Sequence, residues 1–276
     1  MTIIYAASDI HLEFGGPIQV PECDLLLLSG DIFTPWRHPA DRQNHTDAIR
    51  KRERKFFQQC QDKATRTLMV LGNHEHYNGV FGETAAKVRS RLEEFPTITL
   101  LDNEVAEFVD FAVFGATMWT DMNKDHPEVM WHARRNMSDF SVIYSYKGTG
   151  YQDPSVGFTP ADTVKENTYS KQKMVEFLSN YADKKTIVMT HHAPTYGCID
   201  REFSADILSY AFANTDLDDM LLDNNGPDVW LYGHCHHRKE FLHGDKTSII
   251  ANARGYFNYG PESQLVNTFE FKEIVI

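Results

Sequence analysis

The sequence predicts an α/β fold in which mixed sheets and helices form one layered domain over residues 1–276. Short apolar runs of strand length recur along the chain, and amphipathic helical patterns lie between several of them. Strands near both ends with helices between them favour one layered domain over a chain of independent modules. With 42% hydrophobic residues, a chain of this length can bury a sizeable core.

The expected elements follow from these patterns. We expect strands at the apolar runs Ile3–Ala7, Leu25–Leu28, Leu68–Leu71, Ile98–Leu101, Phe111–Phe114, Ile187–Met189, Val229–Tyr232, Thr247–Ala251 and Val266–Phe271. We expect helices at Thr46–Ala64, Glu83–Phe95 and Val164–Tyr181. Trp119–Pro160 lacks sustained periodicity, so we expect an irregular insertion there, either a lid or substrate-facing segment or a plain surface excursion.

Composition limits the classes of partner. The formal net charge of −12 argues against broad, sequence-independent binding to DNA or RNA, which requires many cationic side chains. The four cysteines form no CxxC pair, so neither a disulfide framework nor a thiolate zinc site is indicated. Met1–Ala7 leads directly into the first motif, so we expect no signal peptide, and no apolar run approaches membrane-spanning length. We therefore expect a cytoplasmic protein without a membrane partner; the sequence carries no indication of its oligomeric state.

Five of the apolar runs lead into side chains that bind metals. The clusters are Asp9-Ile10-His11, Gly30-Asp31, Gly72-Asn73-His74-Glu75, Thr190-His191-His192 and Gly233-His234-Cys235-His236. Ligands of open α/β sheets gather beyond the carboxyl ends of the strands, so these clusters would converge on one crevice. Three of them begin with a glycine that permits close backbone approach, although each glycine also fits an ordinary turn.

Spacing within the clusters supports convergence. Extended residues two apart point the same way, so Asp9 and His11 would face together while Ile10 turns back to the core. His234 and His236 would do likewise, with the cysteine between them turned away.

Taken in order, the motifs D-x-H, G-D, G-N-H-E, T-H-H and G-H-x-H resemble those of the calcineurin-like metallophosphoesterase superfamily, across residues 9 to 236. The segments Ser-Asp-Ile-His-Leu-Glu-Phe, Met-Trp-Thr-Asp and His-His-Ala-Pro are similar to its small bacterial and phage-type members. The resemblance implies a layered α-β-β-α sandwich of two mixed sheets flanked by helices, and hydrolysis of a phosphate ester.

The resemblance also implies a two-metal centre. Its ligands would be Asp9, His11, Asp31 and His236 for one metal, and Asp31, Asn73, His191 and His234 for the other. Asp31 would then bridge the pair. Imidazoles, carboxylates and one amide suit two divalent or mixed-valence first-row ions such as Mn, Fe, Zn or Ni. Two such ions about 3.5–4 Å apart can hold a bridging hydroxide for in-line attack on phosphorus.

His74 is the implied catalytic residue. Its family counterpart lies beside the metals without binding them, so His74 would stabilise the transferring group or protonate the leaving oxygen. The alternative is a histidine that only supports the ligands. The Asp31 motif lacks the further Asp and Arg of the Ser/Thr protein phosphatase branch. His74 is therefore left without an obvious carboxylate partner, for which Glu75 or Asp102 could serve.

Two further positions have open alternatives. Only one side chain of the adjacent pair His191 and His192 can face the metals; we choose His191, and His192 would then support the ligands or contact substrate. Arg254 follows the strand expected at Thr247–Ala251, where its guanidinium could bind a phosphate. An ordinary surface or structural arginine fits that position equally well.

Three functions are compatible with these motifs. The leading hypothesis is a phosphodiesterase or phosphomonoesterase acting on a small phosphorylated molecule or nucleotide. The second is a nuclease or RNA end-processing enzyme, suggested by the basic run Arg50–Lys55 and the aromatic-rich insertion, although such a run is usually a solvated helix face. Nucleic acid is therefore the less favoured partner. The third is a non-catalytic binding scaffold, which the intact ligand set disfavours.

Overall fold

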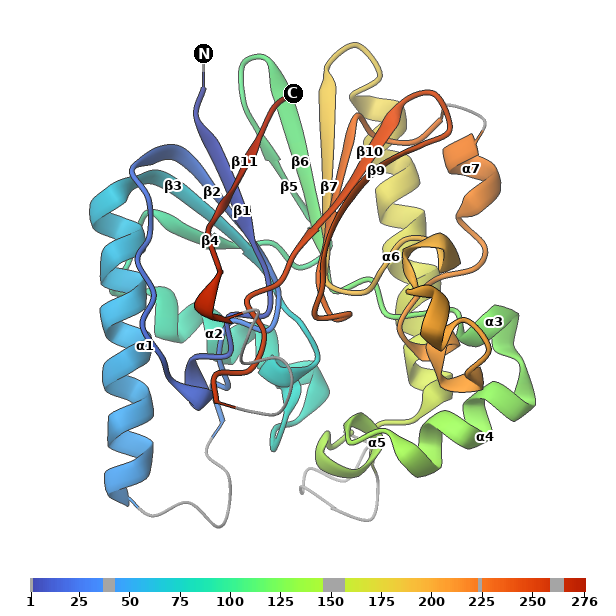
Figure 1. The fold of residues 1–276 in the computed structure, drawn as a ribbon, viewed down its shortest axis with the longest axis horizontal. Helices are drawn as coiled ribbons and strands as arrows, with labels where there is room; N and C mark the ends of the chain where they lie inside the picture. Colours follow the sequence, from blue (N-terminus) through green and yellow to red (C-terminus); the bar gives the residue numbers. More distant parts are fainter. Residues whose placement is uncertain (1, 37–42, 146–156, 223–224, 259–265) are drawn as a thin grey trace.

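The computed structural model describes residues 2–36, 43–145, 157–222, 225–258 and 266–276. Within these residues two sheets pack face to face, and helices cover the outer face of each sheet (Figure 1). The α-β-β-α sandwich of two mixed sheets is therefore confirmed.

Each sheet has a parallel centre. The first contains β1 (Ile4–Ala7), β2 (Cys23–Ser29), β3 (Ala64–Val70), β4 (Ile98–Leu100) and β11 (Lys272–Ile274), in the order β11-β1-β2-β3-β4. The second contains β5 (Glu104–Glu107), β6 (Phe111–Ala116), β7 (Lys185–Thr190), β8 (Val229–Tyr232), β9 (Arg238–His243) and β10 (Thr247–Asn252), in the order β5-β6-β7-β8-β10-β9. Among the strands of the described residues, only β11, β5 and β9 pair antiparallel to their neighbours, each at an edge.

The two parallel centres run in the same direction where they meet. Ser8, just after β1, forms a parallel bridge with Ala253, just after β10. The Asn252 side-chain amide also donates to the carbonyl of Ala6 on β1, at 2.9 Å. The carboxyl ends of both sheets therefore lie at the same end of the sandwich, as a shared site requires.

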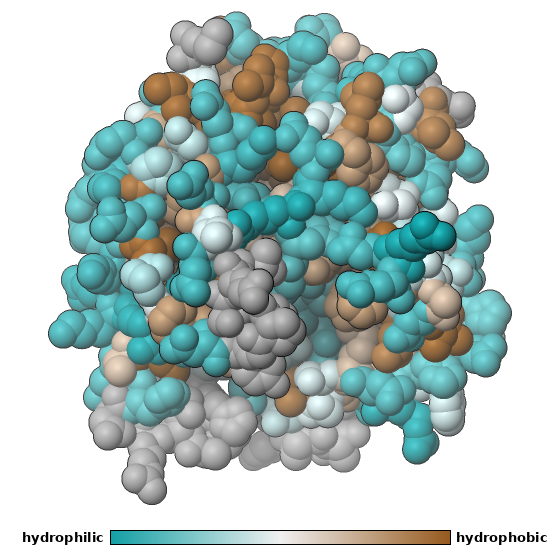
Figure 2. Space-filling model, viewed as in Figure 1, coloured by the Kyte–Doolittle hydropathy of each residue, from teal (hydrophilic) through white to brown (hydrophobic). Residues whose placement is uncertain are grey.

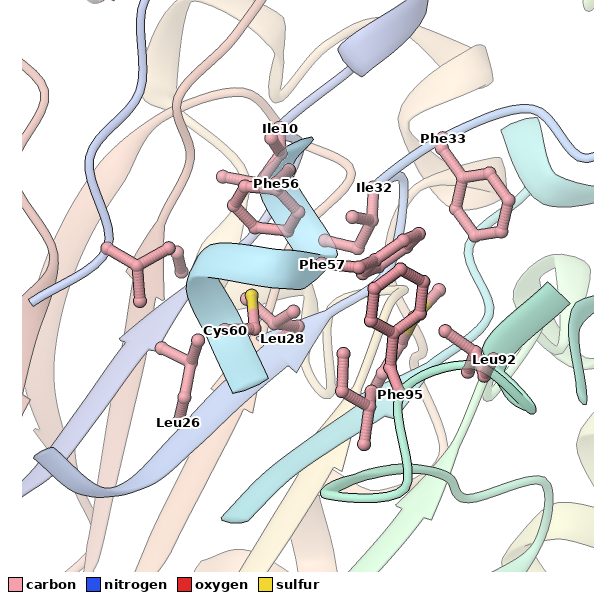
Figure 3. Packing of buried hydrophobic residues seen from close by; sticks show 14 of the residues in the cluster. Ile10, Leu26, Leu28, Ile32, Phe33, Phe56, Phe57, Cys60, Leu92 and Phe95 are labelled. Atoms are coloured by element: carbon pink, nitrogen blue, oxygen red, sulfur yellow. The ribbon is translucent and has the colours of Figure 1, made fainter. Parts of the chain in front are cut away.

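The helices divide between the two outer faces. The first sheet is covered by α1 (Gln43–Lys63) and α2 (Thr84–Leu92), and the second by α6 (Pro160–Asn180) and α7 (Asp218–Leu222) (Figure 1). Phe56, Phe57 and Cys60 of α1 pack in one buried cluster with Leu26 and Leu28 of β2 (Figure 3). The intervening Leu25 and Leu27 belong to the cluster between the sheets, because successive strand residues face opposite sides.

Not every expected element is found. The strand expected at Val266–Phe271 is wrong, since β11 begins only at Lys272, and Phe269 and Phe271 instead pack against the cluster under α1. The sequence analysis missed the edge strands β5 and β9, because both are rich in charged residues and one face of each is exposed.

The segment expected to be irregular is partly helical. It contains α3 (Met122–Asp125), α4 (Pro127–Asn136) and α5 (Asp139–Val142), while residues 146–156 lie outside the described part of the chain. Its apolar side chains form a small cluster of their own that includes Trp119, Ala133, Phe140 and Phe158. The described part of this segment is therefore a packed subregion of the fold.

Candidate metal centre

The predicted ligands meet at the shared end of the two sheets. Their carboxylate oxygens and imidazole nitrogens fall into two groups, within each of which the atoms lie within 4.8 Å of one another. The first group is Asp9, His11, Asp31 and His236, and the second is Asp31, His191 and His234. Asp31 belongs to both groups. The structure therefore assembles the carboxylates and imidazoles that the resemblance assigned to each metal.

In the first group the ligand atoms point at one another. His11 Nε2 lies 3.0 Å from His236 Nε2 and 3.6 Å from Asp31 Oδ2. His236 Nε2 lies 3.5 Å from Asp9 Oδ1. All of these side chains except that of His236 are buried.

Asn73 completes the second group through its amide oxygen. Asn73 Oδ1 lies 3.0 Å from His191 Nε2 and 3.1 Å from His234 Nδ1. His191 Nε2 also lies 3.4 Å from Asp31 Oδ2. One carboxylate, one amide oxygen and two imidazoles therefore surround one point.

The protonation pattern of this group fits a metal ion. His191 Nδ1 lies 3.0 Å from the carbonyl oxygen of Ser29, which can only accept, so the ring proton is on Nδ1. Nε2 then faces two oxygens that are also acceptors, an arrangement that a cation between them makes favourable, whether a proton or a metal ion. Two buried atoms of the candidate ligands, Asp9 Oδ2 and His234 Nε2, have no hydrogen-bond partner among the described residues. The donor set and these atoms therefore fit first-row metals.

Close backbone approach explains the glycines. Gly30 has φ +82°, and a Cβ there would lie 2.5 Å from His191 Nδ1. A Cβ on Gly233 would lie 2.8 Å from Asp9 Oδ2. At Gly30 and Gly233, therefore, the absence of a side chain allows the backbone to approach the ligands closely.

The backbone at the ligands differs from the expectation. Asp9, His11, Asp31, His234 and His236 all have φ between 47° and 65°, the left-handed region, and not the extended conformation from which convergence was argued. Such residues are strained by about 1–3 kcal/mol each and occur where function requires them. The side-chain directions were nevertheless expected correctly, since the two intervening residues pack into the buried clusters on the outer faces of the sheets: Ile10 and Cys235.

The centre is electrostatically polarised. Burial favours a raised pKa at Asp31, but the nearby His191 and His74 outweigh it and hold the pKa of Asp31 well below its usual range. Burial likewise opposes protonation of His191, yet Asp31 raises the pKa of His191 to about 9. Burial holds the pKa of His234 well below its ordinary value, which leaves a neutral imidazole. An anionic aspartate is thus shared between sites that favour cations.

His74 has a carboxylate partner that the sequence analysis did not identify. Glu13 Oε1 lies 3.1 Å from Nδ1 of both His74 and His11. Burial raises the pKa of Glu13, but these two hydrogen bonds outweigh it and lower the pKa to about 2. Glu13 therefore holds a proton on Nδ1 of each ring and turns both Nε2 atoms toward the centre. In the sequence Glu13 stands two residues after His11, but its position beside both rings depends on the short helix η1 (Leu12–Phe14) and on the tertiary contact with His74.

The partners suggested for His74 serve elsewhere. Glu75 accepts the backbone N–H groups of Gly72 and Ile32, both at 2.7 Å, and so ties the loop after β2 to the loop after β3. Asp102 lines a different cavity, of about 370 Å³, beside His76 and Trp119. Tyr256, two residues after Arg254, reaches His74 instead, with its hydroxyl 3.2 Å from Nε2.

The two positions with open alternatives are both buried. The His192 ring packs between Trp119 and His234, with centroids 4.8 and 4.3 Å away. This position favours support of the ligand His234 over contact with substrate. Arg254 is 1% exposed and donates to the carbonyls of Ile10 at 2.6 Å and Gly15 at 2.9 Å. Its guanidinium therefore holds the loop that carries Asp9 and His11. This environment supports the structural role of Arg254 over direct phosphate binding.

A hydrogen-bonded chain connects the insertion to the ligands. The Asn73 side-chain N–H donates to the Tyr77 hydroxyl at 3.1 Å, and that hydroxyl donates to Asp139 Oδ2 at 3.3 Å. Asp139 is the first residue of α5 and is buried. Because the amide nitrogen is fixed in this way, the amide oxygen faces His191 and His234. Neither Tyr77 nor Asp139 carries a motif that sequence reasoning could have recognised.

Two arginines of the basic run Arg50–Lys55 on α1 bind other parts of the protein. Arg52 donates to the carbonyls of Leu12 at 3.0 Å and Glu13 at 2.9 Å. Arg54 pairs with Glu94 at 2.8 Å on the surface. At least Arg52 is therefore part of the structure that positions Glu13.

A cavity of about 520 Å³ opens over the ligands. Asp31, Asn73, His234 and His236 lie at one side of it together with His74 and Tyr256. Residues 136–139 of the insertion and residues between Ile199 and Phe212 form other parts of its wall. The insertion therefore contributes to the wall that faces the candidate metal centre.

Carboxylates, imidazoles and one amide around a shared aspartate form the kind of site found in metal-dependent hydrolases. The family model for calcineurin-like phosphoesterases matches residues 4–238, and the chain belongs to this family.

Two comparisons extend over nearly the whole chain. An uncharacterized protein, L509, of Acanthamoeba polyphaga mimivirus is 28% identical over 283 residues, covering 93% of this chain and 92% of that protein. The crystal structure of phosphopantetheinyl hydrolase (PptH) from Mycobacterium tuberculosis superposes with a TM-score of 0.60 at 13% identity, covering 99% of this chain and 95% of that one. The structural likeness supports the fold.

Among the described residues, no helix combines the length and the apolar composition needed to span a membrane.

Proposed function

We propose that the chain is a dinuclear metal-dependent phosphoesterase that hydrolyses a phosphodiester or phosphomonoester of a small molecule or nucleotide. The observation that carries the proposal is the sharing of Asp31 between two groups of ligand atoms at one end of the sandwich. Asp9, His11 and His236 would hold one metal with Asp31, and Asn73, His191 and His234 the other. Mn, Fe, Zn and Ni all suit this donor set.

When bound, two such cations activate water for attack and neutralise charge on the phosphate. The chain's own groups do the rest. Glu13 and Arg254 hold the loop of Asp9 and His11, and the Tyr77 hydroxyl holds the Asn73 amide. These contacts fix the ligand atoms before substrate arrives.

His74 is the residue that we assign to proton transfer. Its Nδ1 proton is held by Glu13, and its Nε2 lies 4.0 Å from Asp31 Oδ2, at the edge of the cavity. A phosphate placed over Asp31 would therefore be within reach of this nitrogen. Asp31 and Glu13 outweigh burial and raise the pKa of His74 to about 9, so the ring is protonated at neutral pH. It can then donate to the leaving oxygen.

The substrate would be a small phosphorylated molecule or nucleotide. A nuclease role has weaker support, because Arg52 of the basic run donates to backbone carbonyls. A cytoplasmic location, which we also propose, agrees with the four free cysteines of the chain.

The direct test is hydrolysis by the purified protein loaded with Mn²⁺. We expect turnover of bis-para-nitrophenyl phosphate, para-nitrophenyl phosphate or both, and two metal ions per chain by elemental analysis. No hydrolysis of either ester by protein with both metals bound would overturn the enzymatic proposal. Substoichiometric metal after loading would instead favour a non-catalytic scaffold.

A further inference from the structure

Five apolar side chains from the insertion and the Ile199–Phe212 segment line the cavity, among polar ones. Phe203, Leu208 and Phe212 line it, together with Ile199 and Met137. Phe203 is 55% exposed, although it is a large aromatic residue. The Phe212 ring lies 4.5 Å from the ring of His234, a candidate metal ligand. Apolar side chains therefore extend from the solvent to the metal centre along one wall.

This wall is part of a packed structure. Met137 and Phe212 both pack against the apolar cluster of the insertion. In Figure 1 the Ile199–Phe212 segment lies directly against α4, and Figure 2 shows hydrophobic residues among hydrophilic ones on that side of the molecule. The wall is therefore formed before any ligand binds, as in most small-molecule sites.

Away from the candidate ligands and His74, the acidic groups of the cavity are three carboxylates. Asp139, Asp200 and Asp206 line it, and no Lys or Arg is among its described lining residues. Asp200 is paired with Lys239 at 3.3 Å. Asp206 caps the short helix η6 (Ile207–Ala211) by accepting from the Leu208 N–H at 2.9 Å. Asp139 is 3% exposed, and its Oδ1 has no hydrogen-bond partner among the described residues.

These features discriminate between classes of substrate. Sites for polyphosphates and nucleic acids supply Arg and Lys to each additional phosphate. Here the metal centre would take one phosphate, and the described lining residues beyond it are apolar side chains, carboxylates and other polar groups, with no Lys or Arg. An additional anionic group would be repelled, whereas an apolar or positively charged group would be accommodated.

We propose that this cavity binds the organic part of the substrate, and that the substrate is an ester of a single phosphate with an alcohol that is apolar and either uncharged or cationic. This inference rests on the proposed phosphoesterase function and narrows its substrate class.

Three para-nitrophenyl phosphodiesters of equal length test it, with butyl, 4-aminobutyl and 3-carboxypropyl as the second ester group. With the Mn²⁺-loaded protein, we expect kcat/KM for the carboxypropyl ester to be about tenfold or more below that of the other two. Equal or preferred hydrolysis of the carboxypropyl ester would overturn the inference and leave the phosphoesterase function standing. Hydrolysis of para-nitrophenyl phosphate but of none of the three diesters would also overturn the inference and leave the function standing. Hydrolysis of none of these four esters, with metal bound, would contradict the function itself.

Two variants locate the effect. Asp206→Asn keeps an acceptor for the Leu208 N–H but removes the charge. It should therefore reduce the difference in kcat/KM between the aminobutyl and carboxypropyl esters. Phe203→Ala should lower kcat/KM for the butyl ester more than for the matching methyl ester, by about tenfold. The matched controls are Asp110→Asn, in the exposed turn between β5 and β6, and Trp131→Ala, 56% exposed on α4. If the control variants change these kcat/KM values as much as Asp206→Asn and Phe203→Ala do, the wall does not bind the organic part of the substrate.

Discussion

The two sides of the cavity are built in different ways. On the metal side, each ligand follows a parallel strand of a buried sheet, and short motifs carry the ligands. The other part of the wall comes from residues 136–139, which join α4 to α5, and from short helical turns, with no recognisable motif. Under the function that we propose, the chemistry would reside in the strand ends and the specificity in the irregular segments, as is common where loops are mounted on a rigid scaffold.

The largest expected effect is on the metal side. Asp31→Asn should abolish turnover of every ester and lower the metal content, because both ligand groups lose their shared carboxylate. Elemental analysis measures the metal content, and a para-nitrophenyl ester assay measures the turnover. Asp110→Asn is the matched surface control. Retained activity with two metals bound would show that Asp31 is not the shared ligand.

The next largest effect is expected at Glu13, which positions His74 and His11 but is not itself a candidate metal ligand. Glu13→Gln should lower kcat by about 10–100-fold while metal remains bound. Glu13 helps to raise the pKa of His74 to about 9, so the protonated form of His74 is lost as pH rises through that value. Without the Glu13 carboxylate, the alkaline limb of the pH–kcat profile should therefore move to lower pH. An alkaline limb at the same pH in the variant would mean that Glu13 does not act on His74.

A smaller effect connects the two sides. Tyr77→Phe and Asp139→Asn should each weaken binding of the second metal by about tenfold, because the Asn73 amide loses its support. Calorimetric titration of the metal-free protein with Mn²⁺ measures this without relying on turnover. Tyr169→Phe, half exposed on α6, is the control. If the two variants bind both metals as wild type does, the insertion does not support the ligands.

The smallest effect on chemistry is expected at Arg254. Arg254→Met should reduce the free energy of unfolding by about 1–3 kcal/mol, since buried carbonyls lose their donor. Urea denaturation measures this loss. At temperatures where the variant is folded, KM should change little. A large rise in KM with unchanged stability would instead restore the phosphate-binding interpretation.

Sequence reasoning succeeded where local pattern determines structure. Asp9, Asp31 and His234 follow apolar runs that are buried strands, so their convergence could be argued from topology alone. It failed where tertiary contacts decide. The left-handed backbone at the ligands depends on neighbouring loops, and the contact of Glu13 with His74 spans 61 residues of sequence.

Tertiary contacts also determine the cavity wall at Asp139 and the edge strands of the two sheets. Asp139 reaches Tyr77 only because the insertion packs against the loop after β3, which no periodicity indicates. The polar edge strands β5 and β9 lack the apolar signature of central strands. Phe269 and Phe271 alternate as strand residues would, yet they pack under α1 ahead of β11.

A crystal structure of the Mn²⁺-loaded protein, with anomalous data collected at the manganese edge, tests the central claim most directly. We expect two anomalous peaks on either side of the Asp31 carboxylate, one bound by Asp9, His11 and His236 and the other by Asn73, His191 and His234. A single peak, or peaks that do not share Asp31, would contradict the two-metal centre.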